Sequence, residues 1–575
     1  MFLFHHPPAN HPNHNPYKPF TFLLEVMVDN SGNGQRKTAE ELAKKQRDIS
    51  IAEFFEKNRH LLGFDNPRKA LLTAVKEAVD NALDACEEAR ILPEIEVGLI
   101  QLGETRFRVI IEDNGPGIVK EQVPKIFAKL LYGSKFHKLA QSRGQQGIGI
   151  SAAVLYGQLT TGKPATIISK TGTGKKAYTC KLKINTQNNS PDIQEEQQVE
   201  WEGKAHGTKI EIDLEGAYMK GRQSVDEYLK ETAIINPHAT IIYTNPEASQ
   251  SIYSRAANKL PDEPKEIQPH PYGVELGKLM KMLENTEYRT LQAFLTNEFC
   301  KVGPGTAKEI CENAALLPST KPDTFTREMA EQLFNGIQKT RIMSPPTDCL
   351  SPIGQELLEK SLKKEINAEF YTATSRPTFV YRGNPFQIEV GIAYGGTQPK
   401  DEQVNLLRFS NRVPLLYQQG ACAFSKSVMG TAWKPYGLNQ SGGSLPIGPV
   451  TILLHIASVW VPFTSESKEA LAHYPEIIKE IKLALQEAGR KLQSYVHKKV
   501  KVQNQLERAN MFDNYIPEVA DALFRLTGEP KEALIKKLKE MIKKEEIQNT
   551  INQMSTLKGE VEEDTKLADK SEDED

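Results

Sequence analysis

The sequence lacks the features of a membrane-spanning or secreted protein. No apolar run reaches the roughly 18–20 residues that cross a bilayer, and the best candidate, Phe20–Val28, is short and contains Glu25. No positively charged segment followed by an apolar stretch and a small-residue cleavage site opens the chain. We therefore expect a cytoplasmic protein that has no membrane partner.

Cysteine is scarce, and no two cysteines lie close together in the chain. No CxxC pair occurs, which argues against a disulfide scaffold and a structural zinc site and favours a reducing compartment. The six cysteines are Cys86, Cys180, Cys300, Cys311, Cys349 and Cys422.

The chain also has no large excess of positive or negative residues, since its net charge is −2. Apolar residues make up 39% and charged residues 25%, which is ordinary globular usage and excludes a wholly disordered chain. The balance hides an acidic end: Leu557–Asp575 holds nine acids and three lysines, a net of −6, so the rest of the chain carries +4. A local basic surface for nucleic acid is therefore not excluded.

The 575 residues predict three or four domains in an α+β multidomain chain. Residues 1–36, rich in His, Pro and Asn, are expected to form a disordered leader. Residues 37–230 alternate helix and strand patterns, 231–316 are helical, and 317–515 are mixed and end in a long helix. Residues 516–575 are expected to form a helical extension and an acidic disordered tail.

The long helix expected after Ser465 carries apolar residues at three- and four-residue spacing. A coiled-coil seam and a helix packed on a neighbouring sheet both give this pattern. The sequence leaves the two open. The residues are Ile478, Ile481, Leu485, Ala488, Leu492 and Tyr495.

A polar stripe marks the helix expected from Pro67 to Arg90. Glu77, Asn81 and Asp84 lie at i, i+4 and i+7, within a narrow arc of the helix surface, and apolar residues flank them. The Asn81 amide oxygen is suited to a hard cation such as Mg²⁺, and the Glu77 carboxylate can take a proton from water. An exposed polar helix face would give the same pattern.

Three further segments suggest a nucleotide site. A strand ends in Asp113 and is followed by Gly115 and Gly117, where the backbone can approach a ligand closely. The segment Ser142–Ser151 contains three glycines before a helix and could expose amides to a phosphate. Thr208 starts a further strand. By contrast, Thr171–Lys175 lacks the residues of a P-loop and is expected to be a hairpin turn.

The order of these segments resembles the GHKL ATPase family, whose fold is a layered α/β sandwich of the Bergerat type. The resemblance implies that the cofactors are ATP and Mg²⁺, with Glu77 as the general base, Asn81 as the metal ligand and Asp113 as the adenine contact. Further contacts to the nucleotide are then expected from Asp84, Gly115, Gly117, Ser134, Lys135, Gly144, Gln145, Gln146, Gly147, Ile148, Gly149 and Thr208.

Within that family, the rest of the chain resembles the B subunits of type IIB DNA topoisomerases. The phosphoacceptor helix of a histidine kinase and the acidic cleavage domain of a gyrase B subunit are not evident. The stretches that carry the resemblance are Lys44–Asn58, which is similar to an N-terminal strap, His270–Leu316, which is similar to a helix–two-turn–helix domain, and Leu445–His455 with Val461–Ala470, which are similar to the transducer.

This second resemblance also implies roles for two loops. It makes Lys434, in the Trp433–Leu438 segment, the lysine that reaches from the transducer to the γ-phosphate. In the helical domain, Val302–Ala307 could present its amides to DNA, although a simple helix–helix turn would explain the same glycines.

The function that the resemblance implies is that of the ATP-hydrolysing subunit of a DNA topoisomerase. The chain would dimerise with ATP and gate the passage of double-stranded DNA through a break made by a separate A subunit, in an A2B2 heterotetramer. The alternative is an ATP-driven clamp of the chaperone or MutL repair type, which would have no topoisomerase partner.

Overall fold

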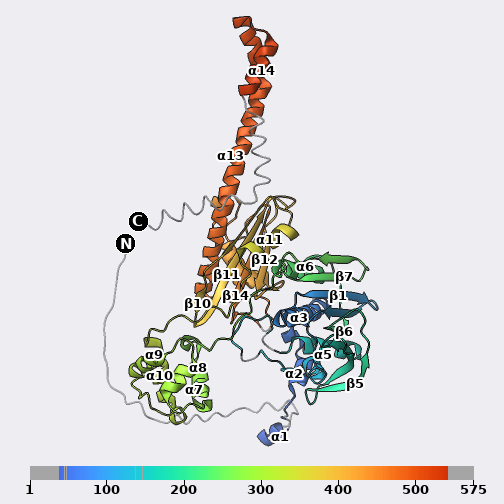
Figure 1. Ribbon diagram of the computed structural model, residues 1–575, viewed down its shortest axis with the longest axis vertical. Coiled ribbons are helices and arrows are strands. Elements are labelled where there is room, and N and C mark those ends of the chain that lie inside the picture. Colours follow the sequence, from blue (N-terminus) through green and yellow to red (C-terminus); the bar gives the residue numbers. More distant parts are fainter. Residues whose placement is uncertain are drawn as a thin grey trace, which may run out of the picture. The chain divides into compact units, whose positions relative to one another are not determined.

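The computed structural model (Figure 1) describes residues 38–541 apart from Lys45, Arg47, Phe136, His137, Gln145, Gln146 and Glu466. The predicted leader, 1–36, and the predicted acidic tail lie outside the described residues. Helix α1 (Ala39–Ala43) belongs to a unit that ends at Ile49, and a second unit begins at Ser50. Within the part of the chain that is described, no helix has the length and apolar character needed to cross a membrane.

The second unit begins with an eight-stranded mixed sheet in the order β5-β4-β3-β6-β2-β1-β7-β8. All neighbours are antiparallel except β1 and β7, which run parallel. The Thr171–Lys175 segment joins β3 to β4, which confirms the predicted hairpin turn. The strands are β1 (Glu94–Gln101), β2 (Arg106–Asp113), β3 (Ala165–Lys170), β4 (Ala177–Asn185), β5 (Ser190–Val199), β6 (Gly207–Glu215), β7 (Thr240–Thr244) and β8 (Gln250–Tyr253).

Helices cover this sheet and complete the predicted layered sandwich (Figure 1). The central helix, α3 (Pro67–Glu88), begins where the Asn66 side chain accepts a hydrogen bond from the Lys69 N–H at 2.9 Å and Pro67 occupies the first turn. Its apolar face is buried against β2 and α5. The other helices here are α2 (Ile51–Lys57), η1 (Arg59–Leu62), α4 (Val123–Ala128), α5 (Gly149–Thr161) and α6 (Val225–Ile235).

The first sheet extends further along the chain than the sequence pattern indicates. The boundary expected at residue 230 falls inside α6, and β7 and β8 continue the sheet to Tyr253. The pairing of β7 with β1 joins distant parts of the chain, so periodicity alone does not reveal it.

A helical region follows, with a hydrophobic core of its own. That core runs from Val274 to Ile342 and includes α10, so it passes the boundary expected at residue 316. The stretch Val302–Ala307 lies between α8 and α9 and contains the first turn of α9. The elements are η2 (Pro271–Gly273), α7 (Leu276–Asn285), α8 (Leu291–Glu298), α9 (Pro304–Asn313), η3 (Pro322–Thr324) and α10 (Arg327–Lys339).

The last globular part is a six-stranded sheet in the order β10-β11-β14-β12-β13, with β9 paired to β11. The predicted hairpin is confirmed, since β10 and β11 pair antiparallel. The elements are α11 (Gln355–Glu365), β9 (Phe370–Ser375), β10 (Phe379–Tyr381), β11 (Asn384–Tyr394), β12 (Asn405–Ser410), β13 (Val413–Pro414), η4 (Gln419–Ala421), α12 (Ala423–Met429), η5 (Lys434–Tyr436), β14 (Val450–Ser458), α13 (Pro475–Thr527) and α14 (Lys531–Met541).

Helix α13 packs on the second sheet, which decides between the two explanations of its apolar spacing. Ile481, Leu485 and Leu492 are fully buried in one cluster with strand residues such as Val390 and Ile452. The first part of the helix therefore gains its stability within the chain rather than from a coiled-coil partner. The helix continues without a break through residue 515 to Thr527.

This packing makes a stability prediction. Leu485→Ala should lower the free energy of unfolding by about 2–5 kcal/mol, because it opens a cavity in a close-packed core. Urea denaturation followed by circular dichroism should show the same loss at low and high protein concentration. A loss that depends on concentration would instead indicate a coiled-coil partner. Leu526→Ala, on the same helix at a side chain that is 82% exposed, is the control and should change stability by less than about 0.5 kcal/mol.

Candidate functional site

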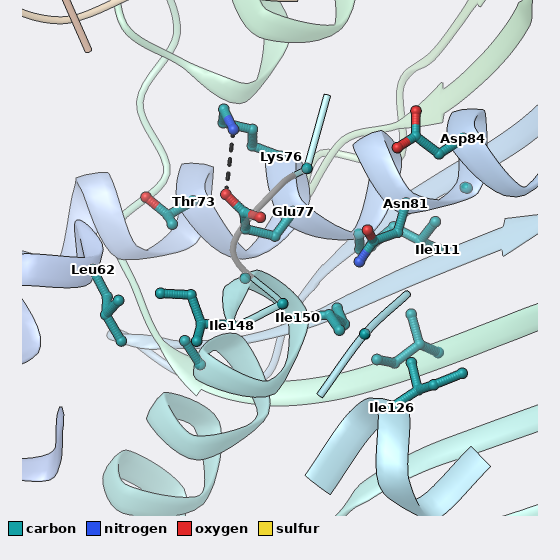
Figure 2. A pocket seen from close by; sticks show the side chains of 18 of the residues that line it. Leu62, Thr73, Lys76, Glu77, Asn81, Asp84, Ile111, Ile126, Ile148 and Ile150 are labelled. Atoms are coloured by element: carbon teal, nitrogen blue, oxygen red, sulfur yellow. Dashed lines mark hydrogen bonds and ion pairs between the residues drawn. The ribbon is translucent and has the colours of Figure 1, made fainter. Parts of the chain in front are cut away.

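A pocket of about 660 Å³ lies between α3, the end of β2, the start of α5 and two loops of the second sheet. Figure 2 shows Glu77 and Asn81 projecting from α3 at this pocket, with Ile111, Ile126, Ile148 and Ile150 among its lining. Most of the candidate residues line it: Glu77, Asn81, Asp84, Asp113, Gly117, Ser134, Lys135, Gly144, Gly147, Ile148, Gly149 and Thr208. Gln145 and Gln146 lie outside the described residues, and Gly115 is not part of the lining.

Glu77 lies against the first turn of α5. A Cβ atom added at Gly149 would fall 1.8 Å from Glu77 Oε2, so a larger residue here would displace the Glu77 carboxylate. The Lys76 ammonium lies 3.2 Å from the other oxygen, Oε1 (Figure 2). Burial acts to raise the pKa of Glu77, but the charges of Lys76 and Lys468 outweigh it and hold that pKa below its ordinary value. The carboxylate is thus ionised at neutral pH and has Oε2 directed at the helix terminus.

The N-terminus of α5 is suited to binding an anion. Its N-cap residue is Ile148, whose side chain cannot accept a hydrogen bond from the first amides of the helix. Those amides therefore need an acceptor from elsewhere, and the helix dipole favours one that is negatively charged. Gly147, with φ of 59°, and Gly149 bring this backbone close to Glu77.

Asn81 lies one helical turn after Glu77, with its side chain exposed to the pocket. None of the residues that the structure describes forms a hydrogen bond with its amide. One amide oxygen that is free to ligate suits Mg²⁺, which usually keeps several waters and takes phosphate oxygens with one or two protein ligands.

Asp113 is buried at the end of β2 and is 6% exposed. Its Oδ1 accepts hydrogen bonds from the N–H of Gly115 at 2.8 Å and of Thr208 at 3.1 Å, which leaves Oδ2 for a donor in the pocket. Burial raises the pKa of Asp113 to about 6, against the opposing effect of the two backbone N–H groups. Gly115 and Thr208 therefore orient the carboxylate.

Asp84 lines the pocket, but its carboxylate is paired with basic side chains of the chain itself. Both of its oxygens are paired, with Lys135 at 2.6 Å and with Arg143 at 2.7 Å. Arg143 also forms a two-pronged ion pair with Glu87, at 2.7 and 2.9 Å. Asp84 thus fixes Lys135, which lines the pocket, and Arg143, which precedes the glycine-rich segment.

The second sheet contributes a wall of the pocket that sequence reasoning missed. Lys468 lines the pocket, and its ammonium lies 3.4 Å from the carbonyl oxygen of Arg143. Burial lowers the pKa of Lys468, and Glu77 partly offsets this. The neighbouring residue Glu469 forms an ion pair with Lys69 of α3 at 2.5 Å. The only signal in the sequence was the polar run after Pro462, which the resemblance had assigned to the transducer.

The structure places Lys434, the lysine expected to reach the γ-phosphate, outside this pocket. Lys434 is exposed in η5 and is not part of the pocket lining. Its turn is held on α13, because Trp433 is buried and the Tyr436 ring packs so closely on Gly489 that an added Cβ would lie 2.5 Å from it. The lysine that the second sheet brings to the nucleotide pocket is Lys468.

Comparisons with known proteins agree with this division of the chain. Residues 66–186 match the family "Histidine kinase-, DNA gyrase B-, and HSP90-like ATPase", and residues 345–508 match "Topoisomerase VI B subunit, transducer". The solved B subunit of the DNA gyrase from Myxococcus xanthus covers 77% of this chain and 95% of its own at 12% identity and a TM-score of 0.39, a similarity too low to support an argument.

Close relatives share a single name, since each is the B subunit of a type 2 DNA topoisomerase 6. The protein from Methanosarcina acetivorans is 55% identical over 483 residues, 84% of this chain and 78% of that protein. The one from Methanococcoides burtonii is 54% identical over 486 residues, with the same coverage. The one from Natronomonas pharaonis is 38% identical and covers 86% of this chain and 85% of its own. This chain therefore belongs to the family of type 2 DNA topoisomerase 6 B subunits.

Proposed function

We propose that the chain binds and hydrolyses ATP and that this drives DNA strand passage by a type IIB topoisomerase. The observation that carries the proposal is the position of Lys468, a transducer residue, in the wall of the pocket that contains Glu77. A nucleotide in this pocket contacts two domains at once. Its binding and hydrolysis can therefore change how the domains are held together.

The nucleotide would lie with its adenine at Asp113 and its phosphates at the start of α5. The free oxygen of Asp113 accepts a hydrogen bond from the exocyclic amine of adenine, while the amides at Gly147–Gly149 donate to phosphate oxygens. Thr208, Gly117, Ser134 and Lys135 complete the lining. At Gly117 the backbone has φ of 72°, and an added Cβ would lie 2.1 Å from the Lys170 carbonyl, so this wall requires glycine.

Asn81 would hold Mg²⁺ together with phosphate oxygens and waters, and the ion would neutralise charge on the phosphates when bound. Glu77 would take a proton from the attacking water at Oε2, because Oε1 is held by Lys76. Lys468 would donate to the terminal phosphate as a compact charge. After that phosphate leaves, the Lys468 ammonium loses its partner, and the transducer is released.

The proposed assembly includes partners outside this chain. Two copies would dimerise with ATP in the cytoplasm around double-stranded DNA, and a separate A subunit would supply the DNA-cleaving chemistry in an A2B2 heterotetramer. Exposed apolar side chains on α13 beyond Asn510, at Met511, Phe512 and Tyr515, support a protein contact on this helix. An ATP-driven clamp without a topoisomerase partner is not supported, because the transducer match and the relatives all point to the B subunit.

Relaxation of supercoiled plasmid DNA tests the proposal. The chain mixed with the A subunit should relax DNA only when ATP and Mg²⁺ are present, and neither protein should do so alone. ATP hydrolysis by the chain without any dependence of relaxation on ATP would contradict the coupling.

The role of Glu77 predicts a separation of binding from hydrolysis. Glu77→Gln should bind ATP with an affinity close to that of the parent but lose at least about 10²-fold in turnover, the usual scale for a positioned general base. Calorimetry and a phosphate-release assay measure the two effects. Asn81→Ala is the contrast and should weaken ATP binding only when Mg²⁺ is present. Unchanged turnover in Glu77→Gln would remove Glu77 from this role.

The position of Lys468 predicts an effect that depends on the terminal phosphate. Lys468→Ala should reduce affinity for a non-hydrolysable ATP analogue by roughly 10- to 100-fold, the scale of one charge-assisted hydrogen bond, and leave ADP affinity nearly unchanged. Lys434→Ala, on an exposed turn outside the pocket, is the matched control. An ATP-specific defect in Lys434→Ala together with a parent-like Lys468→Ala would show that Lys434 has this role after all.

The surroundings of Asp113 predict a pH dependence. Its pKa of about 6 means that acidification below pH 6 protonates the carboxyl, which then loses its acceptor for the adenine amine. Nucleotide affinity should therefore fall as the pH drops through about 6. In Asp113→Asn the backbone donors hold the amide oxygen and turn the NH₂ group toward the adenine, so affinity should be low at every pH. If the fall persists in Asp113→Asn, it comes from titration of the nucleotide phosphates instead.

A further inference from the structure

Lys76 contacts the carboxylate of Glu77 although the two residues are neighbours in a helix. Successive side chains on a helix diverge by about 100°, so adjacent residues do not normally face each other. The Lys76 ammonium nevertheless lies 3.2 Å from Glu77 Oε1, as the dashed line in Figure 2 shows. A further contact is therefore needed to turn the lysine side chain toward Glu77.

Asp80 supplies that contact from behind the pocket. It lies one helical turn after Lys76, and its Oδ2 accepts a hydrogen bond from the ammonium at 3.1 Å. Asp80 is 6% exposed and is not part of the pocket lining, whereas Lys76 and Glu77 both line the pocket. The lysine is thus held by one carboxylate outside the lining and itself holds the other carboxylate at the pocket.

Asp80 is in turn held by a tyrosine from another helix. Tyr228 of α6 is fully buried, and its Oη donates to Asp80 Oδ1 at 2.9 Å. The two oxygens of Asp80 therefore have one partner each, the phenol and the ammonium. Because a carboxylate that is withdrawn from water needs such partners, the phenol fixes the position of the negative charge that attracts Lys76.

The charges around Lys76 favour a role toward Glu77 over a role as a phosphate contact. An ammonium has three N–H groups, and two carboxylates of the chain already accept from that of Lys76. Burial acts to lower the pKa of Lys76, but Glu77 and Asp80 outweigh it and raise that pKa above its ordinary value. The charge of Lys76 is therefore balanced within the chain, before any nucleotide binds.

We propose that Tyr228, Asp80 and Lys76 are positioning residues for ATP hydrolysis. Together they hold the Glu77 carboxylate with Oε1 occupied, so that Oε2 alone is left to take the proton from the attacking water. They act through Glu77, so their effect disappears when its carboxylate is removed. The inference rests on the proposed function, because it concerns the general base of that same site.

Tyr228→Phe and Lys76→Met test the positioning role. Tyr228→Phe keeps the buried ring and removes one hydrogen bond, so turnover at saturating ATP should fall roughly three- to tenfold in a phosphate-release assay. Lys76→Met keeps an unbranched side chain and removes the charge that holds Oε1, so turnover should fall at least about tenfold. Calorimetry should show that affinity for a non-hydrolysable ATP analogue stays within about threefold in both, since the base rather than the nucleotide is misplaced.

A double-mutant cycle separates positioning of Glu77 from loss of structure. In the Glu77→Gln background, Tyr228→Phe and Lys76→Met should each change the residual turnover by less than about twofold, because the carboxylate through which they act is gone. Tyr156→Phe on α5 is the matched control. It removes another buried phenol of the same domain, which donates to the Glu215 carbonyl at 3.2 Å, and should leave turnover unchanged.

Three results would overturn the inference. The first is parent-like turnover in both Tyr228→Phe and Lys76→Met, and the second is a full further loss in the Glu77→Gln background. The third is a loss of analogue affinity in Lys76→Met that accounts for its defect, which would make Lys76 a phosphate contact instead.

The parent chain and Glu77→Gln, measured in the same assay, test the proposed function separately. A parent that does not hydrolyse ATP would overturn both the proposed function and the inference. A parent that hydrolyses ATP and loses turnover in Glu77→Gln, with Tyr228→Phe and Lys76→Met unaffected, would overturn only the positioning role.

Discussion

The need to pair four carboxylates on α3, one buried and three half-buried, is the constraint on which the rest of this structure depends. Glu77, Asp80, Asp84 and Glu87 follow one another at three- and four-residue spacing, and a charge that is withdrawn from water is costly unless it is paired. Their partners come from different parts of the chain. Lys76 pairs with the first two, Lys135 and Arg143 with Asp84, and Arg143 and His238 with Glu87. The nucleotide pocket and the segment at Arg143 are thus assembled around a single helix.

The same acidic helix joins the nucleotide pocket to the transducer. Arg412, beside Asn411, lies 3.9 Å from Glu87 and donates to the carbonyl of Ser351 at 2.9 Å, while its backbone N–H donates to His455. His455 in turn contacts Glu389, which is fully buried in the second sheet. Burial acts to raise the pKa of Glu389, but His455 and two backbone N–H groups hold it below its ordinary value. A continuous path of polar contacts therefore runs from Arg143 through Glu87 into the transducer core.

Local features were predictable from the sequence, and contacts between distant segments were not. The spacing of Glu77, Asn81 and Asp84 defines one helix face whatever the rest of the chain does, and the position of Asp113 at a strand end follows from the strand itself. Lys468 and Lys434 offer equal local signals, so only the packing of the transducer on α3 identifies Lys468 as the pocket residue. The strands β7 and β8 were missed for the same reason, because β7 pairs with β1 across a long stretch of chain. The sequence also left open what the apolar face of α13 packs against, because that depends on where the second sheet lies.

The structure of the chain with a non-hydrolysable ATP analogue and Mg²⁺ is the most direct test of the central claim, that one nucleotide is held by both domains. The account predicts that the Lys468 ammonium leaves the Arg143 carbonyl for the terminal phosphate, with Asn81 on the metal ion and Asp113 on the adenine amine. A terminal phosphate contacted only by residues of the first sheet and its helices, with Lys468 still on the Arg143 carbonyl, would contradict it.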